Sequence, residues 1–191
     1  ETGAHIVRTQ EYVRCLAHRI RDQGDYVDDL SDEAIDKMHK AAPLHDVGKV
    51  GIPDQILLKP GRLDSTEFEI MKTHTTLGYQ SILSASERLS AGSSFLTCAM
   101  EIALSHQEKW DGTGYPQGLS GDEIPISARL MAVADVYDAL ISERYYKKAF
   151  SHEVAVGIIL EGRGSHFDPD VVDAFKRIEA EFLAIATRFA D

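Results

Sequence analysis

Residues 130–140 read L-M-A-V-A-D-V-Y-D-A-L, and this stretch decides the fold class. Its apolar residues, continued to position 141, follow the spacing of an α-helix: Leu130, Val133, Ala134, Tyr137 and Ile141. A helix that is apolar on almost every side is expected to be buried. Asp135 interrupts this helix, and a buried, unpaired carboxylate is costly. We therefore expect a positive group beside Asp135, most economically a metal cation.

The same helical spacing extends in both directions along the chain. It appears at residues 13–20 and 171–182. Further helices are expected over residues 32–45, 65–73, 75–90, 94–106 and 151–161. The last helix has a clear start, with Asp168 as its N-cap and Pro169 at its first helical position. No run of alternating β-branched residues is long enough to propose a sheet, so the sequence predicts an all-α fold.

Two loops rich in glycine and proline interrupt the helices, at residues 46–62 and 107–125. A structureless loop as long as the second one usually serves a function. No internal repeat divides the chain, and 191 residues suit one domain. We therefore expect a single domain over residues 1–191. Because the chain starts at Glu1, in what reads as the middle of a helix, we also expect it to be a fragment of a longer protein.

Charge and composition limit the partners. The 20 basic and 31 acidic residues give a net charge of −11, which argues against a DNA or RNA duplex, or an anionic membrane, as the main partner. A small anionic ligand remains compatible, because a metal ion can invert the field within one cleft. No apolar run approaches the roughly 18 residues of a membrane-spanning helix. Cys15 and Cys98 lie among apolar neighbours, and buried reduced thiols fit a cytoplasmic protein.

Several histidines stand near carboxylates or at the ends of expected helices. Taken one at a time, each would have a separate local role. Together with a carboxylate inside an apolar helix, they indicate one shared site. The candidate residues are His5, His45, Asp46, His74, His106 and Asp135. The remaining histidines are expected to have ordinary surface or structural roles: His18, His39, His152 and His166.

Imidazoles and carboxylates without thiolates suit iron, manganese, zinc or nickel rather than a structural zinc site. Asp46 has two oxygens, so it could bridge two ions while His45 binds one of them. Two ions about 4 Å apart can clamp a phosphate, and a bound metal lowers the pKa of water from about 16 toward 7. Lys49, three residues after Asp46, could contact a phosphate oxygen as a point charge.

These residues lie in strings that resemble a known family. H-D-V-G-K at 45–49 looks like the signature of the HD phosphohydrolase superfamily, and H-Q-E-K-W-D-G-T-G-Y-P at 106–116 closely resembles the second signature of its HD-GYP subfamily. Four further runs are similar to that subfamily: P-L-H-D-V-G-K-V-G-I-P, I-L-L-K-P-G, M-K-T-H-T-T-L-G and L-M-A-V-A-D-V-Y-D-A-L. The match covers nearly the whole chain, and this ordered set is very specific.

The resemblance implies a fold and an activity. The fold would be an HD-type bundle of at least five core helices with a long Gly-Tyr-Pro loop. The activity would be that of a metal-dependent phosphodiesterase, a hydrolase that opens the bacterial second messenger cyclic di-GMP to the linear dinucleotide or onward to GMP. A metal-bound hydroxide would attack phosphorus, so no protein nucleophile is needed. HD-GYP domains often follow receiver or other sensory domains, so the resemblance implies an upstream regulatory region and leaves dimerisation open.

The family pattern also implies the metal ligands. One ion would be held by His5, His45, Asp46 and Asp135. Asp46 would bridge to a second ion held by His74 and His106, and some members bind a third through a glutamate like Glu1. We therefore expect two or three divalent ions, iron or manganese first, with nickel, zinc or magnesium as alternatives.

The same pattern implies how the substrate is held. Asp46 and Lys49 would be the catalytic pair, with Lys49 in contact with the scissile phosphate. Tyr115 of the Gly-Tyr-Pro loop would hold the ligand together with Arg144 and Lys147. Asp138 matches a further ligand-side position.

One departure from the pattern and one proline complete the expectations. The family commonly has two adjacent histidines where this chain has His106 and Gln107, and an amide oxygen is a poorer ligand for a transition metal. The alternative function is therefore a catalytically weak HD-GYP module that binds cyclic di-GMP or a partner protein for signalling. Pro43 is expected to kink the helix before His45 and to aim His45 and Asp46 inward.

Overall fold

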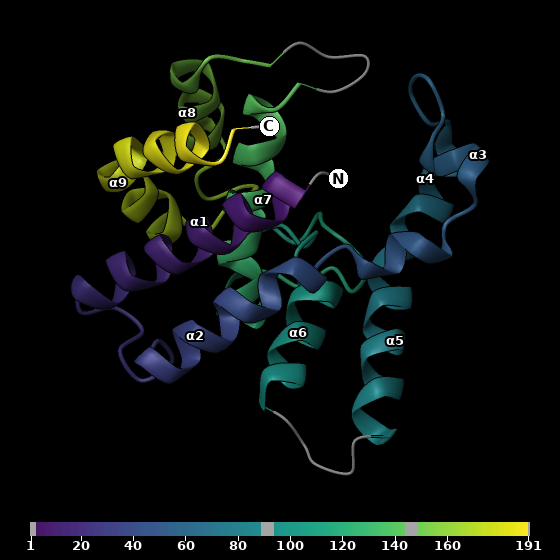
Figure 1. Cartoon of the computed structure of the whole chain (residues 1–191), viewed down its shortest axis with the longest axis horizontal. Coiled ribbons are helices and arrows are strands. Elements are labelled where there is room, and N and C mark those ends of the chain that lie inside the picture. Colours follow the sequence, from purple (N-terminus) through teal and green to yellow (C-terminus); the bar gives the residue numbers. More distant parts are fainter. Residues whose placement is uncertain (1–2, 89–93, 144–148, 191) are drawn as a thin grey trace.

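The structure is a computed structural model that describes residues 3–88, 94–143 and 149–190. Within these ranges the chain forms α-helices, loops and short 3-10 turns without a strand, which confirms the expected all-α fold. The helices are α1 (Gly3–Asp22), α2 (Asp32–Ala41), α3 (Asp54–Leu57), α4 (Ser65–Lys72), α5 (His74–Arg88), α6 (Ser94–Ser105), α7 (Ile126–Ile141), α8 (His152–Glu161) and α9 (Pro169–Arg188) (Figure 1). None of the described helices combines the length and the apolar character needed to cross a bilayer.

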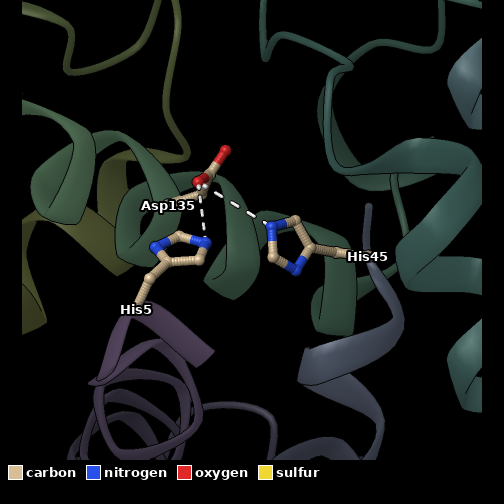
Figure 2. A group of neighbouring side chains, drawn as sticks. All are labelled: His5, His45 and Asp135. Atoms are coloured by element: carbon tan, nitrogen blue, oxygen red, sulfur yellow. Dashed lines mark ion pairs between the residues drawn. The ribbon is translucent and has the colours of Figure 1, made fainter. Parts of the chain in front are cut away.

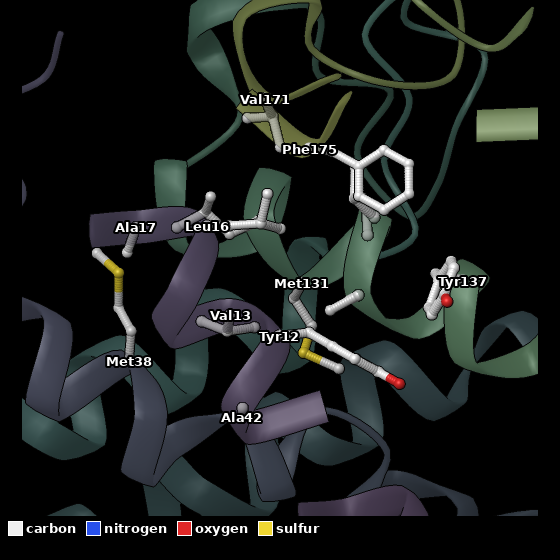
Figure 3. Close-up of a cluster of buried hydrophobic side chains, with 14 of the residues drawn as sticks. Tyr12, Val13, Leu16, Ala17, Met38, Ala42, Met131, Tyr137, Val171 and Phe175 are labelled. Atoms are coloured by element: carbon white, nitrogen blue, oxygen red, sulfur yellow. The ribbon is translucent and has the colours of Figure 1, made fainter. Parts of the chain in front are cut away.

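Helix α7 is largely buried, as its apolar sequence predicted. Of its 16 residues, 11 are buried, and it packs against α1, α6, α8 and α9. Figure 3 shows part of this core, to which α1 contributes Tyr12 and Leu16, α2 Met38, α7 Met131 and α9 Phe175. Burying a large apolar side chain contributes about 1.5–3 kcal/mol. This core therefore fixes the helices from which the polar site is built.

The expected start of the last helix is confirmed. Pro169 is the first residue of α9, and the carboxylate of Asp168 accepts a hydrogen bond from the backbone N–H of Asp170 at 2.8 Å. Asp168 also accepts one from Nη1 of Arg129 on α7 at 2.9 Å, and both side chains are buried. This ion pair joins the start of α9 to α7.

The sequence predicted one helix over residues 32–45, but the helix that begins there is shorter. Helix α2 ends at Ala41, and Ala42–Leu44 form a 3-10 turn, because Pro43 has no N–H for a helical hydrogen bond. The kink expected at Pro43 is therefore an end of the helix. The expected loop over 46–62 is partly helical, with a 3-10 turn at Val47–Gly51 followed by α3.

Both cysteines are free thiols, as expected. Cys98 is buried, whereas Cys15 is only half-buried. Burial raises the pKa of each thiol to about 12. Neither is therefore a nucleophile at neutral pH.

Gly48 allows the H-D-V-G-K segment to lie directly on α5. A Cβ atom at this position would lie 1.9 Å from the carbonyl oxygen of His74 and 2.4 Å from the backbone nitrogen of Gly78. Neither distance leaves room for a carbon atom, so only glycine fits. The contact fixes the turn after Asp46 against His74, the first residue of α5.

We expect Gly48→Ala to destabilise the protein by at least about 2 kcal/mol, because backbone atoms on α5 cannot move aside as a side chain can. Gly157→Ala in α8 is the matched control, since no atom lies within 4 Å of its Cβ position. Alanine is more stable than glycine inside a helix by about 0.5–1 kcal/mol. Urea unfolding measures both changes. Unfolding midpoints for Gly48→Ala equal to those of the wild type would contradict the close approach.

Candidate metal centre

Six polar side chains from separate parts of the bundle meet in two groups. The first group contains His5 of α1, His45 after α2 and Asp135 of α7. The second contains Asp46, His74 at the start of α5 and His106 directly after α6. Within each group, the potential ligand atoms lie within 4.8 Å of one another. The structure therefore brings together all six residues that the sequence assigned to one shared site.

The first group is shown in Figure 2, where both imidazoles face the carboxylate. Oδ1 of Asp135 lies 4.0 Å from Nε2 of His5 and 3.8 Å from Nε2 of His45. Both histidines are buried, and the carboxylate is 18% exposed. Three elements that are distant in sequence thus supply one atom each to a small polar space.

In the second group, two imidazoles face one carboxylate oxygen. Oδ1 of Asp46 lies 3.3 Å from Nε2 of His74 and 3.7 Å from Nε2 of His106. The two Nε2 atoms are 3.5 Å apart. All three side chains are buried.

Asp46 connects the two groups. Its other oxygen, Oδ2, lies 3.2 Å from Nε2 of His45 and 2.5 Å from Nζ of Lys49. One oxygen of Asp46 thus faces each group. This is the placement that a carboxylate needs in order to bridge two cations.

Backbone hydrogen bonds fix the orientation of three of the imidazoles. Nδ1 of His45 lies 2.8 Å from the carbonyl oxygen of Ala42, Nδ1 of His74 lies 2.7 Å from that of Met71, and Nδ1 of His106 lies 3.0 Å from that of Ile102. A carbonyl can only accept, so Nδ1 carries the proton in each bond. Nε2 is therefore the atom available to a cation when the imidazole is neutral.

The electrostatics of the cluster favour a cation. Burial lowers the pKa of His106 to about 4 and also lowers the pKa of His74, so both imidazoles are neutral at pH 7, as metal ligands must be. Burial also disfavours the charged form of His45, but the adjacent carboxylates of Asp46 and Asp135 outweigh it and raise the pKa of His45 to about 9. The two carboxylates thus stabilise one positive charge between them.

A divalent metal fits these residues. Nε2 of His45 is buried and makes no hydrogen bond to the described residues, although carboxylate oxygens stand 3.2 and 3.8 Å away. A metal ion would satisfy this nitrogen and the carboxylates together. Imidazole and carboxylate ligands are those that divalent iron, manganese, zinc and nickel accept.

The Gly-Tyr-Pro loop reaches the rim of the second group. The ring centroid of Tyr115 lies 6.3 Å from that of His74 and 6.1 Å from that of Phe68 on α4. Burial raises the pKa of Tyr115 to about 12, so its hydroxyl stays neutral. Glu1, Arg144 and Lys147, the remaining expected site residues, lie outside the described residues.

Asp138 is buried and hydrogen-bonded within the bundle. Its side chain is 1% exposed, and its two oxygens accept from Nδ1 of His5 at 2.8 Å and from Nε of Arg8 at 2.6 Å. Burial opposes ionisation, but these hydrogen bonds and the charge of Arg8 outweigh it and lower the pKa of Asp138. Asp138 thus lies behind His5 and supports it, and its expected position on the ligand side stays a prediction.

Glu108 is a residue of the second signature that the sequence analysis missed. It is buried, and its carboxylate accepts from the backbone N–H of Gln117 at 2.7 Å and of Leu119 at 3.1 Å. It therefore closes the loop around Tyr115. The sequence did contain a signal for Glu108: it is an acidic residue at the start of a long loop, and the backbone N–H groups of such a loop need acceptors.

The chain is similar to several known proteins. The family model described as "HD domain" matches residues 5–171. A Vibrio cholerae protein named cyclic di-GMP phosphodiesterase is 59% identical over all 191 residues, which make up 39% of that protein. Another from the same organism, named 3'3'-cGAMP-specific phosphodiesterase 2, is 42% identical over the whole chain and 34% of its own length. The chain thus spans well under half the length of these relatives.

A solved structure shares the fold. The chain resembles an HDG"Y"P protein from Bdellovibrio bacteriovorus with a TM-score of 0.62 and 20% identity, over 93% of this chain and 53% of that one. This similarity supports the helical arrangement described above, including a bundle of at least five core helices.

We expect the two groups to bind metal separately and Asp46 to serve both. Asp135→Asn and His106→Ala should each lower the affinity for one of two Mn(II) ions by more than about tenfold, whereas Asp46→Asn should lower the affinity for both ions. Equilibrium dialysis with elemental analysis measures this. His39→Ala is the control, because His39 belongs to neither group and its Nε2 lies 3.0 Å from a carboxylate oxygen of Glu11. Two ions bound to Asp46→Asn with wild-type affinity would rule out the bridging role.

Proposed function

The chain belongs to the HD domain family, and from that premise we propose that it is a metal-dependent phosphodiesterase that hydrolyses cyclic di-GMP. The observation that carries the proposal is the position of Asp46, with one carboxylate oxygen toward each of two histidine groups. The H-D-V-G-K and Gly-Tyr-Pro signatures and the names of the relatives support the same substrate class.

Divalent ions held by the two groups would stabilise negative charge on a phosphate and lower the pKa of a water molecule. The remaining contributions come from the chain. The buried imidazoles keep Nε2 aimed at the cluster, because their Nδ1 atoms donate to backbone carbonyls. Lys49 is about one third exposed, and its Nζ lies 2.5 Å from Asp46. Its ammonium group would contact a non-bridging phosphate oxygen.

The loop from Glu108 to Leu119 would hold the nucleotide. Tyr115 offers a neutral ring beside the second metal group, where it would contact a guanine. Arg144 and Lys147 would hold the phosphates, as the family resemblance implies. Asp138 has no part in this proposal, since it is enclosed by His5 and Arg8.

We propose iron or manganese as the metal, in two sites, with Glu1 as a ligand for a third ion. Gln107 would make the second site the weaker one, because its amide oxygen replaces an imidazole. The catalytic activity would then depend on how well that second site is filled. Since the chain spans less than half of the relatives, we also propose that a regulatory region of the whole protein acts on this domain.

The proposal is tested by a product time course with anaerobically purified protein loaded with Fe(II), Mn(II) or Mg(II). Cyclic di-GMP should disappear in favour of the linear dinucleotide or GMP, and His45→Ala and Asp46→Ala should abolish turnover. 3'3'-cGAMP is tested in parallel, because some relatives carry that name. Faster loss of 3'3'-cGAMP would replace the proposed substrate, and binding without turnover by the metal-loaded protein would favour the signalling module.

We expect Glu108→Gln to lower kcat/KM by about tenfold while metal binding stays unchanged, since an amide NH₂ would face a backbone N–H of the loop. Steady-state kinetics together with Mn(II) dialysis separate the two effects. Glu123→Gln is the matched control: Glu123 accepts from Ser120 in the same loop but is exposed. An equal loss in both variants would show that Glu108 has no special part in shaping the loop.

A further inference from the structure

A buried chain of hydrogen bonds lies behind His5, on the side away from Asp135. Nδ1 of His5 lies 2.8 Å from Oδ2 of Asp138. Arg8 donates two hydrogen bonds to the same carboxylate, from Nε to Oδ1 at 2.6 Å and from Nη2 to Oδ2 at 3.0 Å. The side chains of Arg8 and Asp138 are 4% and 1% exposed. No ligand can reach Asp138 without displacing one of these partners.

Arg8 is itself fixed by two further elements. Its Nη1 donates to the carbonyl oxygen of Phe189 at the end of α9, at 2.9 Å, and its Nη2 donates to Oγ of Ser142 after α7, at 3.1 Å. The guanidinium thus joins α1, α7 and α9. A planar group bound on several sides holds the carboxylate of Asp138 in one orientation.

His5 needs such an external support because of its place in the helix. His45, His74 and His106 each bond to a carbonyl three or four residues earlier in their own segment. His5 stands two residues after the first residue of α1, so the described helix offers it no preceding turn. Asp138 takes the place of that carbonyl.

We propose that Arg8 and Asp138 are positioning residues for metal binding: they hold His5 as the Nδ1-protonated tautomer with Nε2 toward Asp135. A carboxylate can only accept, so it fixes the proton on Nδ1. The proposal rests on metal binding in the proposed function, and does not depend on the identity of the substrate.

A purely structural role is the rival explanation, because a buried ion pair can simply join helices. The chain contains a matched control in Arg129 and Asp168, a second buried Arg–Asp pair on α7 and α9 at 2.9 Å. Arg129 also bonds to Tyr26, Asp122 and the carbonyl of Ile124. None of these groups is among the six candidate ligands.

The experiment compares Asp138→Asn and Arg8→Lys with Asp168→Asn and Arg129→Lys. Asparagine has one acceptor oxygen, so it must turn an NH₂ toward either His5 or Arg8. Equilibrium dialysis with Mn(II) should show one ion bound as in the wild type and the other about 10–100-fold more weakly in Asp138→Asn. Arg8→Lys should give a smaller loss of affinity for the same ion. The control variants should keep both affinities within twofold while their melting temperatures fall.

A second measurement uses the metal-free wild-type protein and needs no variant to fold. Nitrogen-15 NMR of the imidazoles should show His5 protonated on Nδ1. His5 protonated only on Nε2 would overturn the proposal, as would Mn(II) affinities in Asp138→Asn that match those of the controls. Weaker Mn(II) binding without hydrolysis of cyclic di-GMP by the wild type would support the positioning role and contradict the proposed function alone.

Discussion

The structure depends on the burial of one carboxylate, that of Asp46, among three imidazoles. His45, His74 and His106 come from three separate segments, and each has an Nε2 atom within 4 Å of an oxygen of Asp46. Polar groups in a helical core require partners, since burial without them is costly. Helices α2, α4 and α6 must therefore end where the imidazoles that follow them can converge on Asp46. Pro43 and Gly48 meet this demand locally, by ending a helix and by allowing a turn to lie on α5.

Much of this arrangement could be predicted from the sequence. The apolar periodicity of 130–141 predicted a buried helix, and the carboxylate of Asp135 within it predicted a positive group, most economically a metal cation, beside that helix. The six residues assigned to the shared site are the six that meet, because histidines at helix ends and a carboxylate on a buried helix have few other partners. The start of α9 at Pro169 was predicted from local capping chemistry, which depends on adjacent residues alone.

Other features depend on contacts that no local pattern reveals. Arg8 and Asp138 are separated by 130 residues, and the sequence alone placed Asp138 with the ligand. The need of a buried carboxylate for a positive partner holds for Asp138 as well as for Asp135: Asp138 is the more deeply buried of the two, and Arg8 supplies its positive charge. For Glu108 the sequence offered only an acidic residue at the start of a long loop, and its partners, two backbone N–H groups, are identified only in the folded loop.

Backbone dipoles add a charge to the site that side chains do not show. His74 stands where α4 ends and α5 begins, so two opposed helix dipoles meet there and largely cancel. His106 directly follows the carboxyl end of α6, where a helix carries roughly half a negative charge. No α-helix begins within the described loop that follows, so this field is unopposed by a successor. This negative field acts on the second group, in which Gln107 stands where the family commonly has a second histidine. The field of α6 attracts a cation and therefore offsets part of the attraction that the missing imidazole would have supplied.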